Sequence, residues 1–294
     1  MTRTIDRLIS GGKYYEGLRW HDGRWYASDA LRGIVFAIDE SGRREDLLQT
    51  DALCSGLGWL PDGSLLFVSM LDRTLQRRSP DGEVSLHADL ASLSPHWIND
   101  MLVDDVGRAW VGTIGFAIQD GADPEPGELF RVDPDGTVAV AADDLWCPNG
   151  VVMPDERTLV VAESFMGRMT AFTVGDDGSL SDRRVFAQFG EAPEPAGAVE
   201  MLTGLDCAPD GLALDSAGHV WAADAARQRC VRVSPDGEIV DEVKHPDGTN
   251  VYSCALGGSD GRSLLLAASQ GVFEALAGVD GTAELLTTSV EVPA

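Results

Sequence analysis

The sequence predicts an all-β fold: a six-bladed β-propeller with about four antiparallel strands in each blade. Short apolar runs bounded by Asp-Gly turns recur along the chain, as at 65–68 and 159–162, and such runs are typical of strands joined by tight hairpins. The units repeat at intervals of 40 to 60 residues, and repeats of this kind indicate propeller blades. No segment keeps a helical period over the roughly 11 residues that would indicate a helix.

The six units can be followed in order along the chain. Each opens with a turn that leads into an apolar strand: Asp22-Gly23, Asp62-Gly63, Asp105-Val106-Gly107, Asp155-Glu156, Asp215-Ser216-Ala217-Gly218 and Asp260-Gly261. Each is closed by a second turn: Ser41-Gly42, Pro80-Asp81-Gly82, Pro134-Asp135-Gly136, Asp177-Gly178, Pro235-Asp236-Gly237 and Asp280-Gly281. The strand after the first turn carries one large apolar residue in each unit: Trp25, Phe67, Trp110, Val161, Trp221 and Leu266.

These units account for nearly the whole chain, so the sequence favours a single propeller domain over residues 1–294. A β-sandwich with hairpins at irregular spacing is the alternative. The longest intervals contain two insertions, 117–127 and 190–204, which are rich in Pro, Gly and acidic residues and are therefore loops. These loops either form part of a lid over one face of the ring or lie on the surface as solvated segments.

The composition excludes several classes of partner. Lys and Arg number 22 against 48 Asp and Glu, which gives a formal net charge of -26. Such a surface repels nucleic acids and anionic lipids, and no apolar run approaches the roughly 18 residues of a membrane span. The five cysteines lack a C-x-x-C pair, which favours reduced, buried thiols. With no signal-like N-terminus, we expect a cytoplasmic protein whose partner is a small-molecule substrate.

The phase of the repeat selects one set of polar residues. In a propeller, residues at the start of each innermost strand converge on the central axis. The residues six positions before the first-turn Asp are Glu16, Gly56, Asn99, Asn149, Pro209 and Cys254. In the fifth unit Asp210 follows directly and precedes a glycine, as Glu16 and Asn149 do. Taking that glycine as the reference makes Asp210 the axial residue of its blade.

Glu16, Asn99, Asn149 and Asp210 would therefore meet at the mouth of the central channel. Carboxylate and carboxamide oxygens are hard ligands, which suit Ca²⁺, Mg²⁺ or Mn²⁺ and allow Zn²⁺. Glu16 and Asp210 would neutralise one divalent ion, and without it their mutual repulsion would raise a pKa. The structural alternative is that X-Gly before a strand is turn chemistry alone, although Glu is a poor turn residue.

The same residues give the chain a resemblance to the SMP-30/gluconolactonase/LRE-like family. The matching segments run from the first unit to the sixth: Glu16-Gly17-Leu18 with Trp20, Asn99-Asp100 with 107–113, Pro148-Asn149-Gly150-Val151, 209–215 with Gly218 and Trp221, and Cys254 with Gly257-Gly258. The resemblance implies a six-bladed propeller with one catalytic divalent metal. It implies Glu16, Asn149 and Asp210 as metal ligands, with Asp210 also as general base. It implies Asn99 as a residue that contacts the substrate or a metal-bound water and sometimes joins the coordination.

The chain departs from the sugar-lactone members of that family near the N-D motif. Trp97 stands where they typically have Arg, Met101 where they have Gly, and Ala117 where some have an acidic residue that binds sugar hydroxyls. An indole cannot hold several hydroxyl groups as a guanidinium can, so we expect a more apolar or aromatic substrate. Trp97, Phe116, Trp146 and Met101 are candidate substrate-binding residues, and the aromatic ones are equally compatible with plain core.

The resulting hypothesis is a metal-dependent hydrolase that opens a small lactone or related ester, with Asp210 and Asn99 as its catalytic residues. Ca²⁺ is the expected ion. The alternatives are a phosphotriesterase-like hydrolase acting on P–O or P–F bonds and a non-catalytic propeller that binds calcium or a ligand to regulate a partner. The sequence contains neither a G-x-S-x-G elbow nor an obvious Ser-His-Asp set, which argues against a serine hydrolase.

Overall fold

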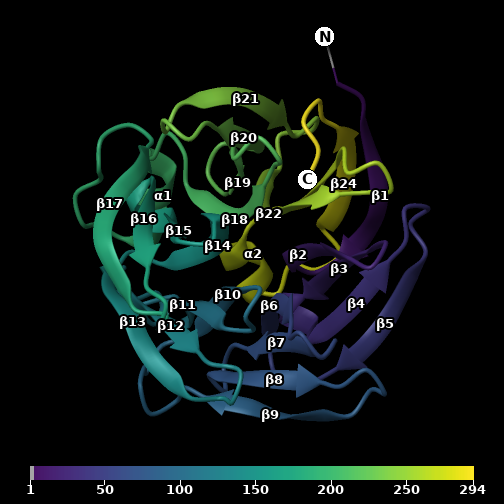
Figure 1. The fold of residues 1–294 in the computed structure, drawn as a ribbon. Helices are drawn as coiled ribbons and strands as arrows, with labels where there is room; N and C mark the ends of the chain where they lie inside the picture. Colours follow the sequence, from purple (N-terminus) through teal and green to yellow (C-terminus); the bar gives the residue numbers. More distant parts are fainter. Residues whose placement is uncertain (1–2) are drawn as a thin grey trace.

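Six four-stranded antiparallel sheets surround a central axis in the computed structural model, which describes residues 3–294 (Figure 1). The innermost strand of each sheet contacts the innermost strands of both neighbouring sheets, all the way round the ring. This arrangement is a six-bladed β-propeller and confirms the predicted fold class. Residues 1 and 2 of the predicted domain 1–294 lie outside the described residues.

The strands fall into four concentric sets. The inner strands are β2 (Tyr15–His21), β6 (Cys54–Trp59), β10 (Ile98–Val103), β14 (Pro148–Asp155), β18 (Pro209–Leu214) and β22 (Asn250–Gly257). The second strands are β3 (Arg24–Asp29), β7 (Leu65–Ser69), β11 (Ala109–Thr113), β15 (Thr158–Glu163), β19 (Val220–Asp224) and β23 (Ser263–Ser269). The third strands are β4 (Ile34–Ile38), β8 (Thr74–Arg78), β12 (Gly127–Val132), β16 (Arg168–Val174), β20 (Arg229–Val233) and β24 (Ala283–Ser289). The outer strands are β5 (Arg44–Gln49), β9 (Val84–Asp89), β13 (Val138–Leu145), β17 (Leu180–Gln188), β21 (Ile239–Lys244) and β1 (Ile5–Gly12).

The ring is closed by strands from opposite ends of the chain. β1 pairs antiparallel with β24, so the N-terminal strand completes the sheet that the C-terminal strands begin, and the two lie side by side in Figure 1. This pairing leaves the sixth blade without a hairpin between its third and outer strands. The predicted second turn at Asp280-Gly281 therefore precedes β24, the third strand, instead of following it.

The first turns confirm the predicted repeat. All six lie between an inner and a second strand, and the large apolar residue predicted in each second strand is buried in the core. Trp25, Trp110 and Trp221 are among the largest fully buried side chains of the described chain. Burial of such side chains between neighbouring blades is the main favourable contribution to folding.

Every inner strand contains a register shift just after its start. Such bulges turn a side chain out of the regular pleat and are common beside functional sites. The residues in the second position of the inner strands are Glu16, Ser55, Asn99, Asn149, Asp210 and Val251. Glycine follows four of them because the inner strands come close there: a methyl group on Gly150 would lie 2.5 Å from the carbonyl oxygen of Asp210.

The observed strand bounds correct the prediction that the axial residue of each blade lies six positions before the first-turn Asp. Gly56, Pro209 and Cys254 are the third, first and fifth residues of their strands, not the second. The count fails because the chosen Asp stands at different places in connections of equal length: Asp62 is the third residue of 60–64, and Asp215 is the first residue of 215–219. In the sixth blade the inner strand β22 is also longer, with 8 residues against 6 in β6. The true equivalents are Ser55, Asp210 and Val251.

The last residue of each second strand is polar and buried, and it faces the first residue of the inner strand: Asp29, Ser69, Thr113, Glu163, Asp224 and Ser269. Asp29 accepts a hydrogen bond from the backbone N–H of Tyr14, and Asp224 accepts one from that of Ala208. These bonds fix the backbone two residues before Glu16 and two residues before Asp210. The start of each of those inner strands is thereby held in place.

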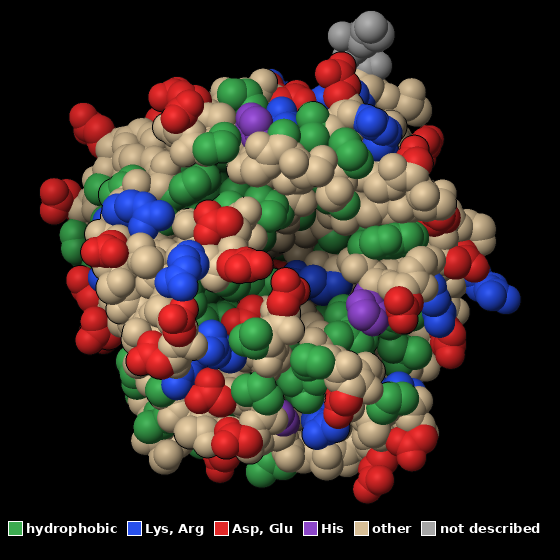
Figure 2. Space-filling view, in the orientation of Figure 1, with side chains coloured by type: hydrophobic (Ala, Val, Ile, Leu, Met, Phe, Trp, Pro, Cys, Tyr) green, Lys and Arg blue, Asp and Glu red, His purple; other side chains and the backbone are tan. Residues whose placement is uncertain are grey.

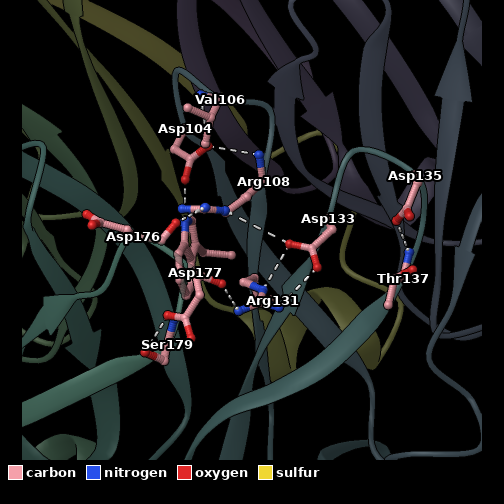
Figure 3. Close-up of polar contacts among 11 residues, drawn as sticks. Asp104, Val106, Arg108, Arg131, Asp133, Asp135, Thr137, Asp176, Asp177 and Ser179 are labelled. Carbon is pink, nitrogen blue, oxygen red and sulfur yellow. Dashed lines mark hydrogen bonds and ion pairs between the residues drawn. The ribbon is translucent and has the colours of Figure 1, made fainter.

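Arginines join neighbouring blades at the end of the channel where the inner strands finish. Arg108 donates to the carbonyl of Asp176 at 2.8 Å and Arg131 donates to that of Asp177 at 2.8 Å, which joins the third blade to the fourth (Figure 3). Asp133 accepts a hydrogen bond from Arg131 at 3.0 Å within the same cluster. Acidic side chains are otherwise spread over the face seen in Figure 2, as the strongly negative composition predicts.

Short helices occupy some of the connections. They are α1 (Ala198–Gly204), α2 (Val272–Leu276), η1 (Ala30–Arg32), η2 (Ile118–Asp120) and η3 (Ser164–Met166). Two of them, α1 and η2, lie in the insertions predicted as loops. No helix within residues 3–294 is long and apolar enough to span a bilayer. All five cysteines are buried and unpaired, as predicted.

Candidate metal and substrate site

The four predicted axial residues line one cavity. Glu16, Asn99, Asn149 and Asp210 face a space of about 90 Å³ at the end of the channel where the inner strands begin. Each comes from a different blade, and each side chain is at least nine-tenths buried. The bulge after the start of each inner strand turns these side chains toward the axis.

Asn149 presents its amide oxygen to the cavity. Its Nδ2 atom donates to the hydroxyl of Ser164 at 3.3 Å, and that hydroxyl donates to the carbonyl of Pro209 at 2.8 Å. The Oδ1 atom is buried and has no hydrogen-bond partner among residues 3–294. A buried acceptor without a donor is costly, so this oxygen is suited to a bound cation.

Asn99 is oriented the other way. Its Oδ1 atom accepts a hydrogen bond at 3.1 Å from the hydroxyl of Ser55, the axial residue of the second blade. The Nδ2 group is then the part of the amide left for the cavity. The two asparagines thus present different chemistry, an acceptor from Asn149 and a donor from Asn99.

The two carboxyl groups of the cavity are strongly perturbed. Burial raises the pKa of Asp210 well above its usual range, and the nearby charge of Asp100 raises it further. Burial also raises the pKa of Glu16, followed by the charges of Asp210 and Asp100. The residues that line the described cavity include no Lys, Arg or His. Two buried carboxylates without a basic partner need a bound cation or protons to be stable there.

These donors fit a divalent cation. Oδ1 of Asp210, like Oδ1 of Asn149, is buried without a hydrogen-bond partner in the described chain. Together with Glu16 they supply oxygen ligands of the kind that Ca²⁺, Mg²⁺ and Mn²⁺ prefer. No cluster of three or more His, Cys, Asp or Glu side chains suited to a metal occurs in residues 3–294. The predicted set contains two carboxylates and one amide, so it does not depend on such a cluster.

The rest of the cavity wall is apolar. Tyr14 and Tyr252 come from the strand starts, and their rings lie 4.9 Å apart. Val272, Phe273 and Leu276 of α2 also line it. Ile118 from the 117–127 insertion and Leu202 from the 190–204 insertion are also part of the wall. Both insertions therefore contribute one apolar side chain to the cavity.

The predicted substrate-binding residues divide into three groups. Trp97 and Asn99 line the cavity. Phe116 and Trp146 lie just behind its wall, where Phe116 packs edge-to-face on the wall residue Phe165 with ring centres 5.3 Å apart. Met101 does not reach the cavity. It is fully buried between the second and third blades, because it follows the bulge and its side chain points into that core.

Sequence reasoning missed several residues of this site. Ser55 has a usable signal, because it precedes Gly56 in the same X-Gly form as Glu16 and Asn149. Ser164 has no such signal, since it lies after a second strand and reaches Asn149 only through the fold. The residues of α2 also gave no signal, because a five-residue helix is too short to show a period.

Comparison with known proteins agrees with this architecture. The protein-family model described as the SMP-30/gluconolactonase/LRE-like region matches residues 15–270 of the chain. The pentonolactonase of Haloferax volcanii is 30% identical over 95% of this chain and 88% of its own length. A 6-deoxy-6-sulfogluconolactonase of Pseudomonas putida is 31% identical over 58% of this chain and 54% of its own length.

A solved structure supports the fold. Regucalcin from Agrobacterium tumefaciens, described as a calcium-binding protein, superposes with a TM-score of 0.78 at 21% identity. The superposition covers 99% of this chain and 95% of that chain. At this level of identity the likeness bears on the fold alone.

Proposed function

Because the chain belongs to the SMP-30/gluconolactonase/LRE-like family, we propose that it is a divalent-metal-dependent hydrolase that opens a small, largely apolar lactone or related ester. The observation that carries this proposal is the cavity in which Glu16, Asn149 and Asp210 meet without a basic side chain. The pentonolactonase relative, which matches along most of both chains, supports lactones as the substrate class.

Glu16, Asn149 and Asp210 would hold the metal through their side-chain oxygens. When bound, a divalent cation would polarise the lactone carbonyl and stabilise the negative charge that develops on its oxygen. Asp210 is suited to accept the proton of the attacking water, because its carboxylate lines the cavity and its Oδ1 atom has no hydrogen-bond partner in the described chain. Asn99 would donate from Nδ2 to a substrate oxygen, since its own oxygen is engaged by Ser55.

The cavity offers no convincing protein nucleophile. Cys147 lines it, but burial and the charges of Asp210 and Glu16 raise the pKa of its thiol. A protonated thiol is a poor nucleophile. The Ser164 hydroxyl already donates to the carbonyl of Pro209, and its oxygen accepts from Asn149. Direct attack by water therefore fits the residues better than a covalent acyl intermediate.

The wall indicates the kind of substrate. Apart from Glu16, Asn99, Asn149, Ser164 and Asp210, the residues that line the cavity are aliphatic, aromatic or sulfur-containing. Trp97 in the wall offers an apolar face where a guanidinium would bind hydroxyl groups. A lactone with an alkyl or aryl substituent suits this wall better than a polyhydroxylated sugar lactone.

The test is a pH-indicator screen of lactones that vary in size and polarity, run with Ca²⁺, Mg²⁺, Mn²⁺ and Zn²⁺ in parallel, with a phosphotriester beside them. Metal-dependent opening of alkyl- or aryl-substituted lactones, faster than opening of sugar lactones, is the expected result. Faster turnover of the phosphotriester would instead indicate a phosphotriesterase-like hydrolase. Tight calcium binding without turnover of any compound would favour a regulatory binding protein.

A further inference from the structure

An ion pair joins two inner strands just after residues of the candidate site: Arg19 lies three residues after Glu16 on β2, and Asp100 lies one residue after Asn99 on β10. Asp100 follows Asn99 on β10, and its side chain is almost fully buried. Its Oδ1 atom accepts a hydrogen bond at 2.9 Å from the Nη2 atom of Arg19, which comes from the inner strand of the first blade. Arg19 also donates to the backbone carbonyls of Leu18, at 2.7 Å, and Met101.

Arg19 stands between the two ends of the channel. It lines the larger cavity of about 860 Å³ at the end where the inner strands finish. Figure 2 shows a hollow at the centre of the ring with basic side-chain atoms inside it. The positive charge of Arg19 also acts on Glu16 of the candidate site. It lowers the pKa of Glu16, although burial and the charge of Asp210 raise that pKa more strongly.

Asp100 is likewise coupled to both proposed carboxylate ligands. Its charge contributes to the raised pKa of Glu16 and to that of Asp210. Its second oxygen, Oδ2, is buried and has no hydrogen-bond partner in the described residues. The other buried acid near Asp210 is Asp224, which is already paired with Arg229 at 3.0 Å. Unlike Asp224, whose charge acts on Asp210 alone, Asp100 acts on both proposed carboxylate ligands, and its partner Arg19 acts on Glu16.

Charge balance explains why such a pair would matter. Glu16, Asp100 and Asp210, when ionised, together with Arg19 carry a net charge of two minus in the buried channel. A single divalent cation would neutralise it. Removing either member of the pair would leave the channel, with its cation bound, one charge away from neutrality, and charges in a buried channel are weakly screened.

We propose that Arg19 and Asp100 are positioning residues that set the affinity of the site for its divalent cation through opposing charges. This inference rests on the proposed function, because it takes Glu16, Asn149 and Asp210 as the ligands. Asp100 strengthens binding of the cation, and Arg19 weakens it while holding Asp100 in place. Neither residue needs to touch the cation for this effect.

Calorimetric titration of the full chain with Ca²⁺ at pH 8 tests the proposal without measuring activity. Asp100→Asn should weaken binding by about tenfold or more, and Arg19→Met should strengthen it by about tenfold. The double variant should return to within about threefold of the unmodified protein, and so should Arg19→Lys, which keeps the charge. If Arg19→Met does not fold, Arg19→Gln takes its place.

A second buried pair provides the matched control. Arg232 donates to Asp215 at 2.7 Å away from the channel, and Asp215 is as buried as Asp100. Arg232→Met should lower thermal stability and leave the Ca²⁺ affinity unchanged. If both Arg19→Met and Asp100→Asn weaken Ca²⁺ binding, or neither changes it, the inference is overturned while the proposed function stands. If the unmodified protein binds no Ca²⁺, Mg²⁺, Mn²⁺ or Zn²⁺, both are overturned.

Discussion

The hydroxyl of Ser164 accepts a hydrogen bond from Nδ2 of Asn149 at 3.3 Å and leaves Oδ1 of that amide facing the cavity without a partner. The same hydroxyl donates to the carbonyl of Pro209, the residue just before Asp210. One serine therefore links two of the proposed ligands, which come from neighbouring blades. Partners of this kind fix the orientation of metal ligands and contribute to affinity.

Ser164→Ala removes this link. The Asn149 amide would then be free to rotate, and we expect Ca²⁺ affinity to fall about tenfold with little change in the fold. Calorimetric titration measures the loss. Ser94→Ala is a suitable control, because Ser94 is also buried but bonds Glu128 on the third blade. Equal affinities for both variants would show that Ser164 does not orient a ligand.

Asp210→Asn separates catalysis from folding. The variant should lose lactone hydrolysis, because it lacks the proposed base and one anionic ligand. The metal-free variant should nevertheless melt at a temperature ~2–4 °C higher or more, because it no longer buries a carboxyl group whose pKa is raised. Circular dichroism melts in EDTA and a lactone assay give the two values. Retained hydrolysis would remove Asp210 from the mechanism.

The stability of the metal-free protein should depend on pH. The pKa values of Glu16 and Asp210 are raised in the folded protein, so it keeps their protons to a higher pH than the unfolded chain does. Its free energy of unfolding therefore falls as pH rises from about 4, the unfolded carboxyl value, through the raised folded values.

Melting curves in EDTA at pH 5, 6, 7 and 8 measure this fall, and saturating Ca²⁺ should abolish it because the bound cation displaces the protons. The variant that carries both Glu16→Gln and Asp210→Asn is the control and should lack the slope. A metal-free protein that is equally stable across this range, or more stable at higher pH, contradicts the assignment of buried acids at this site.

Phe273→Ala tests the role of α2 as part of the substrate wall. Phe273 lines the cavity together with Val272 and Leu276. Its removal should lower kcat/KM for short-chain lactones about tenfold and favour those with longer alkyl chains, because the cavity is enlarged. A series of γ-lactones with increasing chain length measures the shift. Phe186→Ala, in the core of another blade pair, should leave the chain-length preference unchanged.

The fold was largely predictable from the sequence because the blades repeat. Each first turn lies between an inner and a second strand, and Trp25, Trp110 and Trp221 are buried as expected. The closure by β1 was not predictable, since the strand that completes the sixth blade comes from the other end of the chain. Strand pairing between chain ends leaves no local pattern.

The convergence of Glu16, Asn99, Asn149 and Asp210 on one cavity was also predictable, because they share one phase of the repeat. The apolar residues that line the rest of the cavity were less predictable. Met101 was predicted to bind substrate, but the bulge in β10 turns its side chain into the core between two blades. Sequence spacing cannot reveal a bulge whose effect is to change which way a side chain points.

A crystal structure of the protein soaked with Mn²⁺, with the ion located by its anomalous scattering, tests the central claim most directly. We predict one ion in the cavity, with oxygens of Glu16, Asn149 and Asp210 at about 2.0–2.4 Å. An ion bound elsewhere that none of these three side chains contacts would contradict the account.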